Sequence, residues 1–139
     1  MTVSADIDRF LGVGQKDSPA DRISKLRSGL PYTALEMIRN ELDLSLEELA
    51  GALAISPRTL NRRKEENTLK LEESDRVFRL VRVYAHALDV FGTSERAARW
   101  FKRANPVLEA MKPLEVFDTD LGAQIVDDLL TRIEYGVYS

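Results

Sequence analysis

Residues 45–64, SLEELAGALAISPRTLNRRK, constrain the fold more than any other part of the chain. Ser45 and Ser56 are favourable helix N-caps, and Pro57 follows at a first helical position, where its missing N–H costs nothing. Apolar residues recur at helical spacing after Ser45: Leu46, Leu49, Ala50 and Leu53. The sequence therefore predicts two short helices joined by a tight turn.

The second of these helices is polar and strongly basic. Residues 56–64 contain four cationic side chains and no acidic one, although the whole chain has a net charge of −3. A helix-turn-helix presents such a second helix to the major groove of DNA. We therefore expect DNA contacts from Ser56, Arg58, Thr59, Asn61, Arg62, Arg63 and Lys64. The alternative is an ordinary pair of packed helices with a solvated charged face.

The stretch is similar to the helix-turn-helix of the Xre/Cro repressor class, with Ala50 at the small position. The apolar positions of that pattern are filled by Leu49, Leu53, Ile55 and Leu60. Two residues depart from it. Ala54 stands where the turn normally has glycine, and a left-handed residue with a Cβ costs roughly 1–2 kcal/mol. Arg63 replaces the last apolar residue, so either its stem covers the apolar surface or the helix packs differently.

Composition restricts the function. The chain has 139 residues, one histidine and no cysteine, and it has no Gly-rich phosphate loop. These features leave no nucleophile–base pair and no metal cluster, so we expect no catalytic residue, no enzyme activity, no cofactor and no metal. No apolar run approaches the ~20 residues of a membrane span, and the N-terminus does not read as a signal peptide. We therefore expect a cytoplasmic protein without membrane contact, whose only nucleic-acid contact is a local patch.

The rest of the chain also follows helical periodicity, and no alternating strand pattern stands out, so we predict an all-α fold. Helices are expected at residues 18–30, 31–42, 72–91, 94–104 and 120–135. In residues 1–17 we expect partial disorder, with one possible helical turn at residues 6–11 that Gly12 and Gly14 would end. In the last helix the expected apolar stripe is Leu121, Ile125, Leu129 and Ile133. Arg76, Arg79 and Arg82 form either a solvated face or a surface for phosphates or an acidic partner. We expect the single histidine, His86, to be structural.

Several ordered motifs in the second half resemble the toxin-binding domain of the Xre/MbcA/ParS antitoxin family. The motifs are Ser74-Asp75-Arg76, Phe91-Gly92, Ala97 with Trp100, Asn105, Pro113-Leu114, Asp118-Thr119, Gly122 and the ending Arg132-Ile133-Glu134-Tyr135-Gly136. Thr59-Leu60 followed by Arg62-Arg63 is also typical of that family, which accounts for Arg63. The resemblance covers about residues 31–139.

The resemblance implies the antitoxin of a RES–Xre type II toxin–antitoxin system. Its partner would be a RES-type toxin that depletes NAD⁺, and the antitoxin would cover the mouth of the toxin's active site. The N-terminal part would form a homodimer, and the complex would repress its own operator DNA. We accordingly divide the chain into an N-terminal helical and dimerisation segment (1–30), a helix-turn-helix module (31–70) and a C-terminal toxin-binding domain (71–139).

Residues 114–135 contain six acidic side chains and one basic one, which suits a basic pocket built for NAD⁺ phosphates. Tyr135 and Tyr138 combine an apolar ring with a polar tip, which is favoured at interfaces. We expect toxin contacts from Arg132, Glu134, Tyr135, Gly136, Val137, Tyr138 and Ser139. One alternative is a solvated acidic helix with a frayed tail. For the whole protein, the alternative is a stand-alone Xre-like repressor whose C-terminal half only oligomerises.

Overall fold

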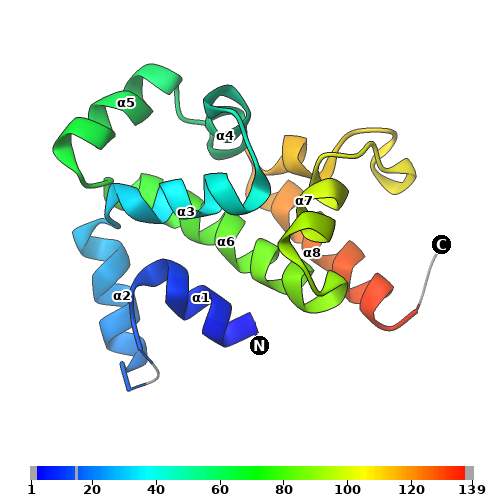
Figure 1. The fold of residues 1–139 in the computed structure, drawn as a ribbon, viewed down its shortest axis with the longest axis horizontal. Coiled ribbons are helices and arrows are strands. Elements are labelled where there is room, and N and C mark those ends of the chain that lie inside the picture. The colour runs from blue at the N-terminus through cyan, green and yellow to red at the C-terminus, as the bar shows by residue number, and fades with distance from the viewer. Residues whose placement is uncertain (1–2, 15, 137–139) are drawn as a thin grey trace.

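The computed structural model describes residues 3–14 and 16–136, and these residues form helices joined by short loops (Figure 1). No strand occurs in these two ranges, so the predicted all-α class is confirmed. The α-helices are α1 (Val3–Leu11), α2 (Pro19–Ser28), α3 (Tyr32–Leu42), α4 (Leu46–Leu53), α5 (Pro57–Glu66), α6 (Leu71–Phe91), α7 (Ser94–Phe101) and α8 (Asp120–Glu134). Two short 3₁₀ helices, η1 (Pro106–Leu108) and η2 (Pro113–Val116), connect α7 to α8.

Hydroxyl side chains begin five of the helices. In each case the side-chain oxygen accepts a hydrogen bond from the backbone N–H three residues later, which satisfies a donor that the helix itself leaves unpaired. The caps are Ser18, Ser45, Ser56, Thr93 and Thr119. These local signals explain why the predicted helix starts agree closely with the observed ones.

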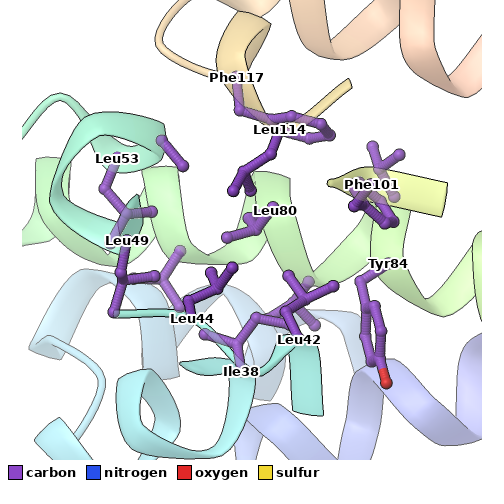
Figure 2. Packing of buried hydrophobic residues seen from close by; sticks show 14 of the residues in the cluster. Ile38, Leu42, Leu44, Leu49, Leu53, Leu80, Tyr84, Phe101, Leu114 and Phe117 are labelled. Carbon is purple, nitrogen blue, oxygen red and sulfur yellow. The ribbon is translucent and has the colours of Figure 1, made fainter. Parts of the chain in front are cut away.

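The 21-residue helix α6 is the centre of the fold and packs against α1, α2, α3, α4, α7 and α8. Leu80 and Tyr84 of α6 are fully buried. Figure 2 shows them between side chains from both halves of the chain, including Ile38 of α3, Leu49 of α4 and Phe101 of α7. One hydrophobic cluster therefore extends from the N-terminal helices to the C-terminal ones.

The possible helical turn at residues 6–11 is confirmed and belongs to the longer helix α1, so the expected partial disorder is wrong for residues 3–11. Phe10 and Leu11 are buried in the core, and the ring of Phe10 meets the edge of Tyr84 at 6.1 Å between centroids. The sequence signal was weak because this helix is short and depends on packing against α6.

Candidate functional sites

The α4–α5 unit has the geometry of a helix-turn-helix. Ala54 follows α4 in the left-handed conformation (φ 53°, ψ 42°), as predicted, and the Ile55 N–H donates to the Ala50 carbonyl at 3.1 Å. Ile55 and Leu60 are buried and fix α5 on the core. The turn is closed further from α6, because Arg76 Nη1 donates to the Ala54 carbonyl at 3.0 Å.

The outward face of α5 is open to solvent. The exposed side chains of α5 include those of Arg58, Asn61, Arg62 and Lys64, and also Pro57, Glu65 and Glu66. Thr59 is half-buried beside the exposed Ser56, whose hydroxyl accepts from the Thr59 N–H and donates to Thr59 Oγ1. Arg58, Asn61 and Arg62 therefore share one exposed helix face, which can contact base edges and phosphates in a major groove, and Lys64 lies to one side of it.

Arg63 differs from the other predicted DNA contacts, because its side chain is buried and points to α6. Its Nε donates to Glu73 Oε1 at 2.7 Å, and its Nη1 donates to Glu66 Oε1 at the same distance. Burial alone would raise the pKa of Glu73, but the hydrogen bonds from Arg63 and from the Lys70 N–H outweigh it and lower that pKa. The hydrogen bonds to Glu73 and Glu66 raise the pKa of Arg63. Arg63 therefore anchors α5 to α6, and we remove it from the direct DNA contacts.

Two of the three arginines spaced along α6 donate hydrogen bonds to backbone carbonyls of neighbouring segments. Arg76 closes the α4–α5 turn, and Arg79 Nη2 donates to the Phe117 carbonyl at 2.7 Å. Only Arg82 is exposed. A fully solvated face is therefore wrong for Arg76 and Arg79, which are partly buried and attach neighbouring segments to α6, whereas the surface for phosphates or an acidic partner stays a prediction.

His86 attaches α8 to α6, in agreement with its expected structural role. Its Nδ1 lies 2.8 Å from Asp127 Oδ1, and its Nε2 lies 3.2 Å from Glu134 Oε1. Burial alone would lower the pKa of His86, but the hydrogen bonds and charges of both carboxylates raise it. Glu134, one of the predicted toxin contacts, is therefore already engaged within the chain.

The exposed face of α8 differs from the prediction. Leu121 and Ile125 were expected in the apolar core stripe, yet their exposed fractions are 70% and 39%. The buried face consists of Gly122, Ala123, Val126, Leu129 and Leu130. Gly122 sets this rotation, because a Cβ at that position would lie only 1.8 Å from the Val116 carbonyl oxygen.

As a result, one solvent-facing stripe runs along α8, which we call the α8 stripe. Its members are Leu121, Ile125, Asp128, Arg132 and Tyr135. Tyr135 is 76% exposed. The stripe unites the predicted contacts Arg132 and Tyr135 with two apolar residues that the sequence analysis missed. The close contact at Gly122 is the signal that could have located them. Gly136 is exposed with φ 71°, and Val137, Tyr138 and Ser139 lie outside the described residues.

Comparison with known proteins defines the class. Residues 86–136 match the family described as the antitoxin Xre/MbcA/ParS C-terminal toxin-binding domain. Residues 21–82 match the antitoxin Xre-like helix-turn-helix domain. The chain therefore belongs to the Xre/MbcA/ParS antitoxin family and is an antitoxin of a toxin–antitoxin system, with a helix-turn-helix ahead of a toxin-binding domain. The stand-alone repressor is thus set aside.

Individual relatives agree with this assignment. The chain is 35% identical over 116 residues to Antitoxin Xre of Photorhabdus laumondii, covering 82% of this chain and 78% of that one. It is 31% identical over 127 residues to Antitoxin Xre of Yersinia enterocolitica, covering 87% and 86%. Among solved structures, it resembles a chain of the Mycobacterium tuberculosis MbcT–MbcA toxin–antitoxin complex. That match has a TM-score of 0.59 and 25% identity, and it covers 78% of this chain and 96% of the other.

None of the described helices combines the length and the apolar character that crossing a membrane requires. Within the described residues, no group of three or more histidine and acidic side chains is arranged to hold a metal ion.

Proposed function

We propose that this antitoxin neutralises a RES-domain, NAD⁺-depleting toxin by covering the entrance of its active site, and that it represses its own operon through α5. The observation that carries the toxin half is the α8 stripe. It places Leu121, Ile125 and Tyr135 in solvent within the part of the chain that matches a toxin-binding domain. Exposed apolar side chains on a charged helix are typical of a surface that a partner covers.

Charge supports the same partner. The segment from η2 to the end of α8 carries six acidic residues and one basic one, so it complements a cleft that is basic because it binds the phosphates of NAD⁺. The resemblance of the motifs to the Xre/MbcA/ParS antitoxins supports a RES-domain toxin. In this proposal the antitoxin works by occlusion, without enzyme activity of its own.

The test is co-expression with the protein encoded beside this gene while cellular NAD⁺ and growth are measured. Leu121→Asp combined with Ile125→Asp should abolish protection, because two carboxylates would be desolvated at the interface. Leu71→Asp is the matched control, since Leu71 is also an exposed leucine, at 47%, but lies on α6. Full protection by the double variant would refute docking through the α8 stripe, and an unchanged NAD⁺ level without antitoxin would refute a RES-type partner.

The terminal residues are proposed to enter the toxin cleft together with Arg132 and Tyr135. Removing residues 136–139 should weaken protection and leave the thermal unfolding midpoint unchanged, because the removed residues follow the last buried side chain of α8. Equal protection by the truncated and complete chains would show that the tail is not needed.

We propose autorepression because α5 exposes basic side chains that can bind operator DNA. Binding to operator DNA also implies a cytoplasmic location. Arg58→Ala with Arg62→Ala should reduce affinity for the DNA directly upstream of the reading frame. Each lost phosphate contact should also lower the slope of log affinity against log salt by about 0.9. Arg132→Ala on α8 removes a comparable charge and should change neither quantity. Identical gel shifts for wild type and the α5 variant would refute DNA reading by α5.

The proposal includes a homodimer formed through residues 1–30, since helix-turn-helix proteins bind paired half-sites. The helix α2 buries none of its own side chains in the single chain. Together with α1 and α6 it borders an apolar groove lined by Ile7, Leu11, Ile23, Leu26 and Phe78. Ile23 is 48% exposed there, so Ile23→Asp should produce a monomer in light scattering. A dimeric Ile23→Asp variant would remove this groove as the interface.

A further inference from the structure

Basic side chains from the toxin-binding half lie beside the first helix of the helix-turn-helix. Residues 94–112 contain two acidic side chains and five basic ones: Arg96, Arg99, Lys102, Arg103 and Lys112. Lys102 Nζ donates to the Asp43 carbonyl at 2.9 Å, and Asp43 stands two residues before the Ser45 cap of α4. The segment is therefore attached directly at the start of α4.

Lys112 directly precedes η2, which packs against the same helix. The pKa of Glu48, in the first turn of α4, is lowered chiefly by the hydrogen bond from the Ser45 N–H, and the positive charges of Lys102 and Lys112 lower it further. Arg99 and Lys102 also border a cleft against Asn40 and Asp43 at the end of α3. Lys102 and Lys112 thus lie near the start of α4, and Arg99 lies beside Lys102 at the end of α3.

The basic groups remain available for a partner. Arg99, Arg103 and Lys112 are exposed, and none of the three forms an ion pair with the described residues. In Figure 1, α5, α4 and the segment between α7 and η2 follow one another along the same side of the molecule. A duplex that lies along this side against α5 would pass α4 before it reaches this segment.

These basic side chains bear on the electrostatic repulsion expected between α4 and DNA. The first helix of a helix-turn-helix crosses the phosphate backbone, yet the first turn of α4 carries Glu47 and Glu48, both exposed. Two carboxylates at that place would repel phosphates. Lys102 and Lys112, from the segment between α7 and η2, place positive charge beside these carboxylates. Within the helix-turn-helix module, Arg39 also lies at this place, because its Nε donates to the Leu44 carbonyl at 3.0 Å.

We propose that Arg99, Lys102, Arg103 and Lys112 form a flanking patch, a second contact with the DNA backbone on phosphates next to the site that α5 reads. The inference rests on the proposed operator binding by α5. It assigns a DNA contact to the toxin-binding half, and it extends the footprint of each protomer beyond the recognition helix. The contact is with phosphates, so it adds affinity and orientation without reading sequence.

The test combines Arg103→Gln with Lys112→Gln, because both side chains are exposed and Lys112 caps η2 only through its backbone N–H. The probe is a duplex of about 30 base pairs from the DNA directly upstream of the reading frame, with a second duplex shortened by about one helical turn on the flanking side. On the long duplex, the variant should lower the salt slope by about 2 and raise the Kd several-fold. The wild type should bind the long duplex more tightly than the short one, and the variant should bind both equally.

Three controls separate the possible failures. Arg132→Gln, which removes a charge from α8, should behave as wild type, and Arg62→Ala should lower affinity on both duplexes. Thermal unfolding and protection against the toxin should be unchanged in Arg103→Gln, Lys112→Gln, which shows that the fold is intact. A wild-type salt slope in that variant, while Arg62→Ala binds weakly, overturns the flanking patch and leaves the proposed function standing. A wild-type protein that binds neither duplex overturns both.

Discussion

At the scale of single residues, the buried pair of Arg63 and Glu73 is the strongest constraint on the recognition helix. The exposed fractions of the two side chains are 5% and 11%. Removing one partner of such a pair leaves a buried charge without compensation. We predict that Glu73→Ala lowers the free energy of unfolding by about 3 kcal/mol, measured by urea denaturation.

Glu66→Ala is the matched control for this prediction, because Glu66 also contacts Arg63 but is half exposed. Its cost should stay below about 1 kcal/mol, as for other surface ion pairs. Because the pKa of Glu73 is lowered in the folded protein, the ionised side chain stabilises the fold at pH values above the ordinary pKa of a glutamate. This stabilisation is lost as the pH falls through the folded-state pKa. Similar costs for the two variants would contradict the dominance of the buried pair.

Ala54 and Arg63 show which residues can be placed from sequence. The left-handed conformation of Ala54 was predictable, because the spacing of two helix caps leaves only one position for the turn. The environment of Arg63 was not, because it depends on Glu73, ten residues later on another helix. A charged residue at an apolar position shows that something compensates it, but local spacing does not identify the partner.

At the scale of elements, the rotation of α8 depends on the close approach at Gly122. A Cβ there would meet the Val116 backbone, which cannot move aside as a flexible side chain could. We predict that Gly122→Ala destabilises the protein by about 3 kcal/mol in thermal or urea unfolding, although alanine is the better helix former. It should also weaken toxin protection, because the α8 stripe would turn.

Gly51→Ala provides the control for Gly122→Ala. Gly51 lies in α4, and no atom lies within 4 Å of the position that a Cβ would occupy. The substitution should therefore stabilise the protein by about 0.5–1 kcal/mol through helix propensity and reduced freedom of the unfolded chain. If the two glycine-to-alanine substitutions change the free energy of unfolding in opposite directions, the effect of packing is distinguished from that of helix propensity. A stabilised Gly122→Ala variant would show that η2 moves aside easily.

The helix α8 also shows why the sequence analysis placed Leu121 and Ile125 on the wrong face. Two overlapping stripes on α8 have helical spacing, one with the larger residues Leu121 and Ile125 and one with Gly122, Ala123 and Val126. Counting apolar bulk favours the first, whereas the structure buries the second, because η2 approaches too closely for anything larger than glycine. In a sequence, a helix face that binds a partner cannot be told from a face that packs in the core, because both show apolar residues at helical spacing.

The attachment of α8 to α6 should depend on pH through His86. Its raised folded-state pKa means that the protonated form is stabilised, so this contribution is complete below pH 6.5 and is lost as the pH rises through the higher folded-state value. We predict that His86→Gln costs about 1 kcal/mol near pH 5.5 and much less near pH 8.5, measured as the difference in unfolding free energy from wild type. An equal cost at both pH values would indicate that packing of the ring, and not its charge, holds α8.

At the scale of the whole molecule, the sequence predicted the helices and their order but not their common core. The boundary between residues 70 and 71 stays a prediction, and α6 bears directly on it. The match to the helix-turn-helix family ends at residue 82, inside α6, and the toxin-binding match begins at residue 86 of the same helix. Only the assembled fold shows α6 packing against helices of both matches.

Because both halves share the core around α6, we predict that the chain unfolds as one cooperative unit. Trp100 is the only tryptophan and reports on α7, whereas far-UV circular dichroism reports on every helix, so the two thermal transitions should coincide. A fragment of residues 71–139 should show little cooperative structure, since Val77, Leu80 and Tyr84 would lose the α1, α3 and α4 side chains that cover them. Two separate transitions in the full chain, or a folded fragment, would instead support independent domains. A single cooperative unit would also mean that a toxin held by α8 stabilises α5, because both helices are attached to α6 through His86 and Arg63.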